Sequence, residues 1–171
     1  MTKYQKWLVN RFLAYKFLTH SWFVGAIWLY FYRLFINDSQ IGVLDGVAFA
    51  IGLLAEVPSG VLADKFGRDK MAKFGQFLAG SGLLVQAFGS SLIQFMLGQA
   101  IMMIGVSFVS GADEALFFDK LKFDKSSTDW RKLMAKASQF ALVGSMTAVI
   151  AGGWIYTFNP RLPWILTGLS F

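Results

Sequence analysis

The stretch EVPSGVLADKFGRDKMAK, residues 56–73, separates two strongly apolar runs of the chain. The run that ends in it is IGVLDGVAFAIGLLAEVPSGVLA, and the run that follows contains FGQFLAGSGLLVQAF. Between the runs lie Asp64, Lys65, Arg68, Asp69, Lys70 and Lys73, with Gly60 and Gly67 placed among them. A short charged turn with glycines, between two helices long enough to cross a bilayer, predicts a hairpin loop at a membrane surface.

The composition favours a membrane protein over a soluble one. Of the 171 residues, 56% are hydrophobic and 15% are charged, whereas soluble domains have about a quarter of their residues charged. The chain has no cysteine, which excludes a disulfide framework and a thiolate metal site. The net charge is +6, and the charged residues fall into clusters that are separated by long apolar runs. This distribution argues against nucleic acid as a partner and for charged loops at a membrane.

Five stretches meet or nearly meet the length of about 20 apolar residues that a helix needs to cross a bilayer. We therefore predict an all-α membrane protein with spans at residues 12–35, 41–63, 71–88, 92–112 and 133–156. Residues 162–171 look like the first half of a sixth span, but they are too few to cross. Glycines within the apolar runs, among them Gly80, Gly82, Gly152 and Gly153, are expected to be helix-packing positions.

The basic residues predict the orientation of these spans. Of the 16 Lys and Arg residues, 14 fall in the N-terminal segment, in the loop between the second and third spans, and in the segment between the fourth and fifth. Arg33 and Arg161 are left for the other side. Because cytoplasmic loops carry the excess of Lys and Arg, the N-terminus and residues 56–73 are predicted to be cytoplasmic.

Residues 60–70, GVLADKFGRDK, resemble the loop signature between helices two and three of the major facilitator superfamily, G-x-L-A-D-[RK]-x-G-R-[RK]-[RK]. Residues 110–119, SGADEALFFD, resemble a stretch found at the same place in many bacterial members. Asp69 departs from the loop signature, where a basic residue is usual. The resemblance covers the whole chain but less than half of such a transporter, which has twelve spans in two six-helix halves.

The resemblance implies that residues 1–171 are an incomplete N-terminal helical domain of a longer transporter. Such a protein moves a small solute by alternating access, is no enzyme and needs no cofactor. It would lie in the plasma membrane, which is the inner membrane of a bacterium. Its expected partners are the lipid bilayer, a small-molecule solute, the missing C-terminal half and protons as a candidate coupling ion. The fragment alone is expected to be inactive.

Two signatures of proton-coupled drug exporters of the family are weak in this chain. Gln99 stands where those exporters usually carry an arginine in helix four. In the fifth span Ala148 and Val149 stand where Gly-Pro would be. These departures argue against a proton-coupled drug antiporter.

The resemblance also suggests a role for the charged loop. In the family the residue that matches Asp64 helps to hold the cytoplasmic side closed. We hypothesise that Asp64, Arg68 and Asp113 form a charge latch; the alternative is a solvated loop that obeys the positive-inside rule. The predicted gating loop and latch comprise Gly60, Asp64, Lys65, Gly67, Arg68, Asp113 and Asp119.

Polar residues inside the spans are candidates for proton or substrate contacts, because ionisable groups are costly in hydrocarbon. These candidates are His20, Arg33, Asp45, Glu56, Gln99 and Gln139. Arg33 and Asp45 flank the turn at residues 37–39, and a structural ion pair is preferred to a substrate role. Glu56 precedes Pro58 and is either a proton or gating group or a packed residue near the cytoplasm.

His20 is the only histidine. Because histidine is the residue type whose intrinsic pKa is near neutral, His20 is a candidate proton or substrate contact; the alternative is a neutral side chain hydrogen-bonded to another helix. Gln99 and Gln139 either line a cavity or join helices. The sequence contains no metal-ligand cluster and no phosphate-binding glycine loop. The rival functions are a non-transporting membrane protein with an interaction or assembly role and, less favoured, a membrane-embedded enzyme.

Overall fold

A computed structural model of the chain describes residues 3–110 and 128–171. Within those two ranges all regular structure is helical, as the sequence predicts. The helices are α1 (Lys3–Thr19), α2 (Trp28–Tyr32), α3 (Asp38–Phe66), α4 (Arg68–Phe88), α5 (Leu92–Val109), α7 (Thr128–Phe158) and α8 (Leu162–Leu169).

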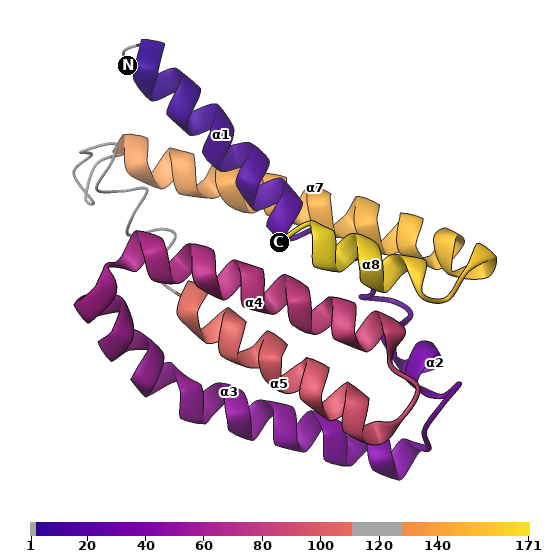
Figure 1. Ribbon diagram of the computed structural model, residues 1–171. Helices are drawn as coiled ribbons and strands as arrows, with labels where there is room; N and C mark the ends of the chain where they lie inside the picture. The colour runs from indigo at the N-terminus through magenta and orange to yellow at the C-terminus, as the bar shows by residue number, and fades with distance from the viewer. Residues whose placement is uncertain (1–2, 111–127) are drawn as a thin grey trace.

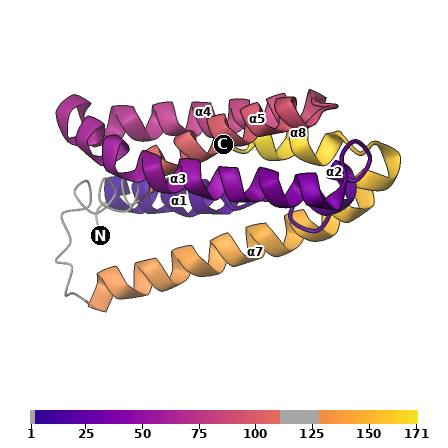
Figure 2. The same ribbon diagram turned by 90° about the horizontal axis from the view of Figure 1, so that it is seen from below.

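The long helices lie side by side along one common direction (Figures 1 and 2). α3, α4 and α5 form a group in which α4 runs antiparallel to the other two and α5 contacts both α3 and α4. α8 packs against α4, and α1 packs against α7. The start of α1, the junction of α3 with α4 and the start of α7 all lie at the same end of the bundle (Figure 1). The structure therefore places basic clusters from distant parts of the sequence at one end.

Three described helices are long and apolar enough to cross a membrane, namely α3, α5 and residues Trp130–Phe158 of α7. The predicted count of five spans is thus not confirmed. α4 occupies the place of the predicted span at residues 71–88, but polar side chains such as Gln76 and Gln86 lower its hydropathy. The predicted first span, residues 12–35, is not one helix, because α1 ends at Thr19 and α2 begins only at Trp28.

α7 packs closely against the chain on both sides of the point where α1 ends. Side chains on Gly144 and Gly152 of α7 would overlap the carbonyl oxygens of Phe17 and Phe23, respectively. Part of the irregular segment is covered by protein, since Ser21, Val24 and Ile27 are buried, whereas His20, Gly25 and Ala26 are exposed. Irregular backbone at membrane depth is tolerated where protein covers it or it lines a water-filled cavity. Hydropathy alone does not reveal such a break, because the segment remains apolar.

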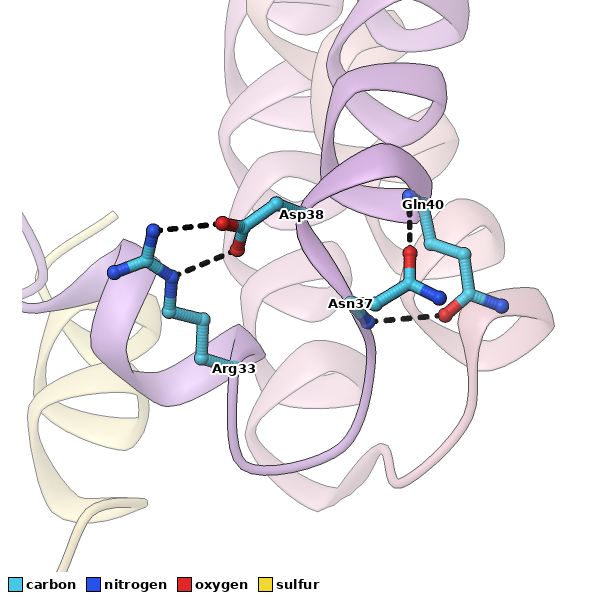
Figure 3. A network of polar contacts seen from close by, with 4 residues as sticks. All are labelled: Arg33, Asn37, Asp38 and Gln40. Carbon is cyan, nitrogen blue, oxygen red and sulfur yellow. Dashed lines mark hydrogen bonds and ion pairs between the residues drawn. The ribbon is translucent and has the colours of Figure 1, made fainter.

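Both ends of α3 are set by local backbone chemistry. Asn37 Oδ1 accepts a hydrogen bond from the Gln40 backbone N–H at 2.9 Å, and Gln40 Oε1 accepts one from the Asn37 N–H at 3.1 Å (Figure 3). This reciprocal capping box satisfies two donors at the start of the helix. At the other end Gly67 has φ of +96°, a conformation that favours glycine. α3 therefore extends beyond its predicted bounds of residues 41–63.

Glycines bring α4 and α5 into close contact. Gly75 faces Gly105, and Gly82 faces Gly98. A Cβ atom built on Gly75 would lie 2.6 Å from the Gly105 carbonyl oxygen, and one built on Gly82 would lie 2.5 Å from that of Gly98. Small residues at these positions let the two backbones come into contact. In a bilayer, where the hydrophobic effect does not drive helices together, close packing of this kind makes them associate. We call these four glycines the α4–α5 seam.

The predicted packing roles of the other glycines are confirmed in three of four cases. Gly80 faces Gly168 of α8, Gly82 belongs to the α4–α5 seam, and Gly152 contacts the Phe23 carbonyl. The role of Gly153 stays a prediction, because a Cβ there would have no described atom within 4 Å.

A cluster of aromatic side chains fills the core where α2, α5 and α8 meet. Tyr32 lies 4.9 Å from Phe95 and 5.3 Å from Trp164 between ring centroids. Phe31 and Phe95 are fully buried, with their ring centroids 6.0 Å apart. Aromatic pairs at these separations add to the stability that burial provides. The cluster therefore packs α2, which follows the irregular segment, against α5 and α8.

Candidate functional site

An open pocket of about 440 Å³ lies between the ends of α3 and α5, next to the charged junction of α3 with α4. Its lining comprises Glu56, Ser59, Gly60, Ala63, Asp64, Arg68, Ser107, Phe108 and Ser110. The buried Ser59 hydroxyl donates to the Ser107 carbonyl oxygen at 3.1 Å and ties α3 to α5 there. A Cβ on Gly60 would have no described atom within 4 Å. This face of α3 is therefore open to a further element.

The charged junction contains an ion pair between two members of the predicted latch. Asp64 Oδ1 lies 3.2 Å from Arg68 Nη2 and accepts a second hydrogen bond from Arg68 Nε at 3.4 Å. The two side chains are 70% and 55% exposed, respectively, so the pair contributes little to stability. It does orient both groups toward the pocket that they line. Asp113 and Asp119 lie outside the described residues.

The unusual acid at position 69 has a partner on its own helix. Asp69 stands in the first turn of α4, where a negative charge faces the positive helix end. Its Oδ2 lies 2.5 Å from Lys73 Nζ. Lys65, the remaining charged member of the gating loop, is exposed and places its ammonium 5.5 Å from the Phe66 ring centroid.

The predicted ion pair between Arg33 and Asp45 is wrong. Arg33 Nε and Nη2 donate instead to the two carboxylate oxygens of Asp38, at 2.8 and 2.9 Å (Figure 3). The hydrogen bond and the charge of Asp38 raise the pKa of Arg33 above its ordinary value. Asp38 opens α3 immediately after the Asn37 cap, so a shorter and bidentate contact wins over the one across the hairpin. Arg33 therefore links the end of α2 to the start of α3 across the turn.

A buried hydrogen bond connects α2 to α4 and was not anticipated from the sequence. The Tyr32 hydroxyl donates to Gln86 Oε1, and both side chains are almost fully buried. Gln86 Nε2 donates in turn to the Gly82 carbonyl oxygen at 3.4 Å. Asp45 is half-buried on α3. The available signal was a glutamine in an otherwise apolar helix, which requires a partner when buried.

The other predicted contact residues are dispersed. His20 lines a second pocket of about 310 Å³ with Lys16 of α1 and with Ser138 and other residues of α7. Its Nδ1 is 3.3 Å from the Thr19 hydroxyl. Glu56 lines the pocket between α3 and α5, while Gln99 is half-buried on α5 and Gln139 is exposed on α7. The described part of the chain does not gather them into one site.

Residues 3–110 and 128–171 contain no group of three or more His, Cys, Asp or Glu side chains that could hold a metal ion. A polar group of another kind stands out in the core. The Trp164 Nε1 atom is buried without a hydrogen-bond partner in the described structure. It belongs to the aromatic cluster around Tyr32.

Comparison with known proteins gives two matches. The family model of the Major Facilitator Superfamily matches residues 11–171. A protein described as an uncharacterized transporter from Buchnera aphidicola subsp. Schizaphis graminum (strain Sg) is 31% identical over 94 residues. The aligned part is 53% of this chain and 24% of that protein, so the match spans about a quarter of the relative's length.

Proposed function

Because the chain belongs to the Major Facilitator Superfamily, we propose that it is part of a secondary transporter that moves a small solute by alternating access. The observation that carries the proposal is the family match over residues 11–171, nearly the whole chain. The chain would belong to the N-terminal half-bundle of such a transporter, which works together with a second half. It would lie in the plasma membrane, the inner membrane of a bacterium, with its N-terminus and the α3–α4 junction in the cytoplasm.

The exposed face of α3 supports a second half. A stripe at helical spacing consists of Gly42, Gly46, Phe49, Leu53, Val57, Gly60 and Asp64, all exposed. We call it the α3 stripe. Phe49, Leu53 and Val57 are each more than 70% exposed, and the three glycines have no described atom within 4 Å of a built Cβ. Small and apolar residues in one row are what a packed helix needs from its neighbour in lipid.

The latch would act at the charged end of that stripe. Asp64 ends the α3 stripe, pairs with Arg68 and lines the open pocket. We propose that a helix of the second half closes over Gly60 and Asp64 in the outward-open state. An acid there would stabilise that state through the positive N-terminal end of the arriving helix. Glu56, two turns earlier on α3 and in the same pocket, is the candidate proton site.

The test is reconstitution of the complete transporter in liposomes, with a panel of radiolabelled solutes and a pH-sensitive dye inside. We expect uptake or release of one solute class, together with proton movement if protons are the coupling ion. Asp64→Asn should lower the transport rate by about fivefold or more, as expected for a coupling of at least 1 kcal/mol. Asp69→Asn is the matched control, because it removes one carboxylate outside the pocket, and it should leave the rate unchanged.

Two results would contradict the proposal. Normal transport by the Asp64→Asn protein would exclude the latch. A reading frame that stops after Phe171, with no solute moved by the reconstituted product, would favour the alternative of a membrane protein with an assembly or interaction role.

A further inference from the structure

The long helices pack into two sets. α1 packs along α7, whereas α3, α4, α5 and α8 pack among themselves. Within residues 3–110 and 128–171, α7 and α8 are the only helices that pack extensively across this division, and the turn at residues 159–161 joins them. We call the first set the α1–α7 pair and the second the α4 group. Figure 2 shows α7 lying apart from α4 and α5.

Contacts at three levels hold the α1–α7 pair together. An apolar cluster joins α1 to the start of α7; it consists of Leu8, Phe12, Leu13, Leu133 and Ala137. Further along α7, Cβ atoms built on Gly144 and Gly152 would lie 2.4 and 1.9 Å from the carbonyl oxygens of Phe17 and Phe23, respectively. Backbones in such close contact are expected to move together.

α2, which follows the irregular segment, is fixed to the α4 group instead. The Tyr32 hydroxyl donates a hydrogen bond to Gln86 of α4. The Tyr32 ring packs against Phe95 of α5 and Trp164 of α8. α2 therefore belongs to the α4 group, and the chain passes from one set of helices to the other between α1 and α2.

The backbone loses its helical hydrogen bonds at this crossing. The Trp22 N–H donates to the carbonyl oxygen two residues earlier, and the N–H groups of Gly25 and Ile27 donate to those three residues earlier. The helical bond to the fourth residue before resumes with the N–H of Trp28. Hinges in proteins are a few residues at the ends of elements that absorb a change of backbone angles. The segment has the form of such a hinge.

Residues 24–27 contact both sets of helices. A Cβ built on Gly25 would lie 2.9 Å from a methyl group of Val149 on α7. Val24 and Ile27 belong to the buried core cluster that also contains residues of α2, α3, α4, α5 and α8. The change from one set to the other thus occurs within these four residues.

One polar contact joins the two sets away from this hinge. Gln76 Nε2 of α4 donates to the Tyr15 hydroxyl of α1, and both side chains are partly buried. Gln76 lies in the first half of α4, nearer the end of the bundle where α7 begins (Figure 1). The α7–α8 turn lies at the opposite end (Figure 1), where Tyr156 of α7 packs against the core cluster.

We propose that the α1–α7 pair swings as a unit away from α4, about residues 24–27 and the turn at residues 159–161, and that the Tyr15–Gln76 hydrogen bond is the clasp that holds it closed. Opening would separate α1 from α4 and widen a path into the bundle from the end that holds the α3–α4 junction. A single hydrogen bond suits a clasp, because its net contribution is modest and leaves the open state populated. The motion takes place inside one half-bundle and does not depend on which solute the protein moves.

The experiment measures distances between spin labels on the complete chain in lipid nanodiscs by double electron–electron resonance. The chain has no cysteine, so labels attach only where cysteines are introduced. The reporting pair spans the two sets and consists of Lys70→Cys on α4 with Lys136→Cys on α7. The reference pairs lie inside one set each; they are Lys6→Cys with Lys136→Cys, and Lys70→Cys with Val61→Cys. All four positions are exposed.

We expect the reporting pair to show a main short distance and a minor longer one. Tyr15→Phe should raise the ratio of long to short about two- to tenfold, which is the effect of losing one hydrogen bond on a two-state equilibrium. Gln76→Leu should give the same rise, and the double variant should add little, because both changes remove the same bond. Tyr32→Phe is the matched control. It removes a tyrosine–glutamine bond inside the α4 group and should leave the ratio unchanged.

Three outcomes would overturn the proposal. One unchanged distance at the reporting pair, in the unaltered chain and in the Gln76→Leu variant, would exclude the swing even if Tyr15→Phe failed to fold. Equal rises in Tyr15→Phe and Tyr32→Phe would mean a general loosening of the bundle and no clasp. A change at a reference pair as large as that at the reporting pair would show that the helices move singly.

Discussion

Replacing Gly105 with alanine tests the α4–α5 seam at one of its contacts. The added Cβ would lie 2.5 Å from the Gly75 carbonyl oxygen and 2.9 Å from the Ala79 Cα. Both are backbone atoms, so no side chain can rotate out of the way. Ordinary contacts of a Cβ begin near 3.4 Å. The Ala79 backbone nitrogen is nearer still, so the two helices must part by about 1 Å at this level to accept one methyl group.

The cost follows from the contacts that this separation weakens. A gap of about 0.5–1 Å forfeits a quarter to a half of the dispersion attraction between the atoms that face it. Overpacking of this kind typically costs about 1–3 kcal/mol. Alanine also gains about 0.5–1 kcal/mol over glycine inside a helix, which offsets part of the loss. The structure supplies a control, Gly153→Ala on α7, which has the helix gain and no clash.

The assay is reversible unfolding in mixed micelles, followed by circular dichroism as a denaturing detergent replaces a mild one. We expect Gly105→Ala to be less stable than Gly153→Ala by about 1–3 kcal/mol, the packing penalty alone. Gly75→Ala should cost a similar amount, and the double variant of Gly75 and Gly105 should cost less than the sum, because the helices need to part only once. Equal stabilities of the Gly105 and Gly153 variants would refute a close seam, and strict additivity would refute a shared contact.

Two further substitutions test other parts of the fold by the same unfolding assay. Tyr32→Phe should cost about 1–3 kcal/mol, because it leaves the buried Gln86 side chain without its donor; adding Gln86→Leu should recover stability, and no recovery would contradict the bond. Gly67→Ala should cost about 1–3 kcal/mol through its positive φ, whereas Gly60→Ala, in a helix with free space, should not destabilise the chain, and equal losses at both sites would argue against backbone strain.

The sequence predicts the helical class and the rough positions of most helices, because long apolar runs have few other solutions in a bilayer. It also predicts the junction at residues 56–73, where Gly67 separates α3 from α4. It fails in the first span, where the backbone between α1 and α2 is irregular and Phe23 lies against Gly152 of α7. That contact joins parts of the chain far apart in sequence, so no local pattern predicts the break.

The candidate site is predicted less completely than the fold. Asp64 and Arg68 are four residues apart in the sequence, with Gly67 between them, and this short separation predicts their pairing. The sequence predicts the wrong partner for Arg33. Equal depth in a hairpin only brings two residues to the same level, whereas Asp38 lies five residues from Arg33 at the start of a helix and can contact it directly. Pairing across distant segments, such as Tyr32 with Gln86, cannot be deduced from residue types alone.

The glycines of this chain divide it into a part that is packed and a part that is open. In the α4–α5 seam each glycine is required by a backbone that touches it, and Gly80 is required in the same way by Gly168 of α8. In the α3 stripe, Gly42, Gly46 and Gly60 have room for a side chain on every described side. Glycine lowers the stability of a helix. At the three open glycines of the stripe, no contact described here compensates for that loss. Close approach by another helix would account for all three.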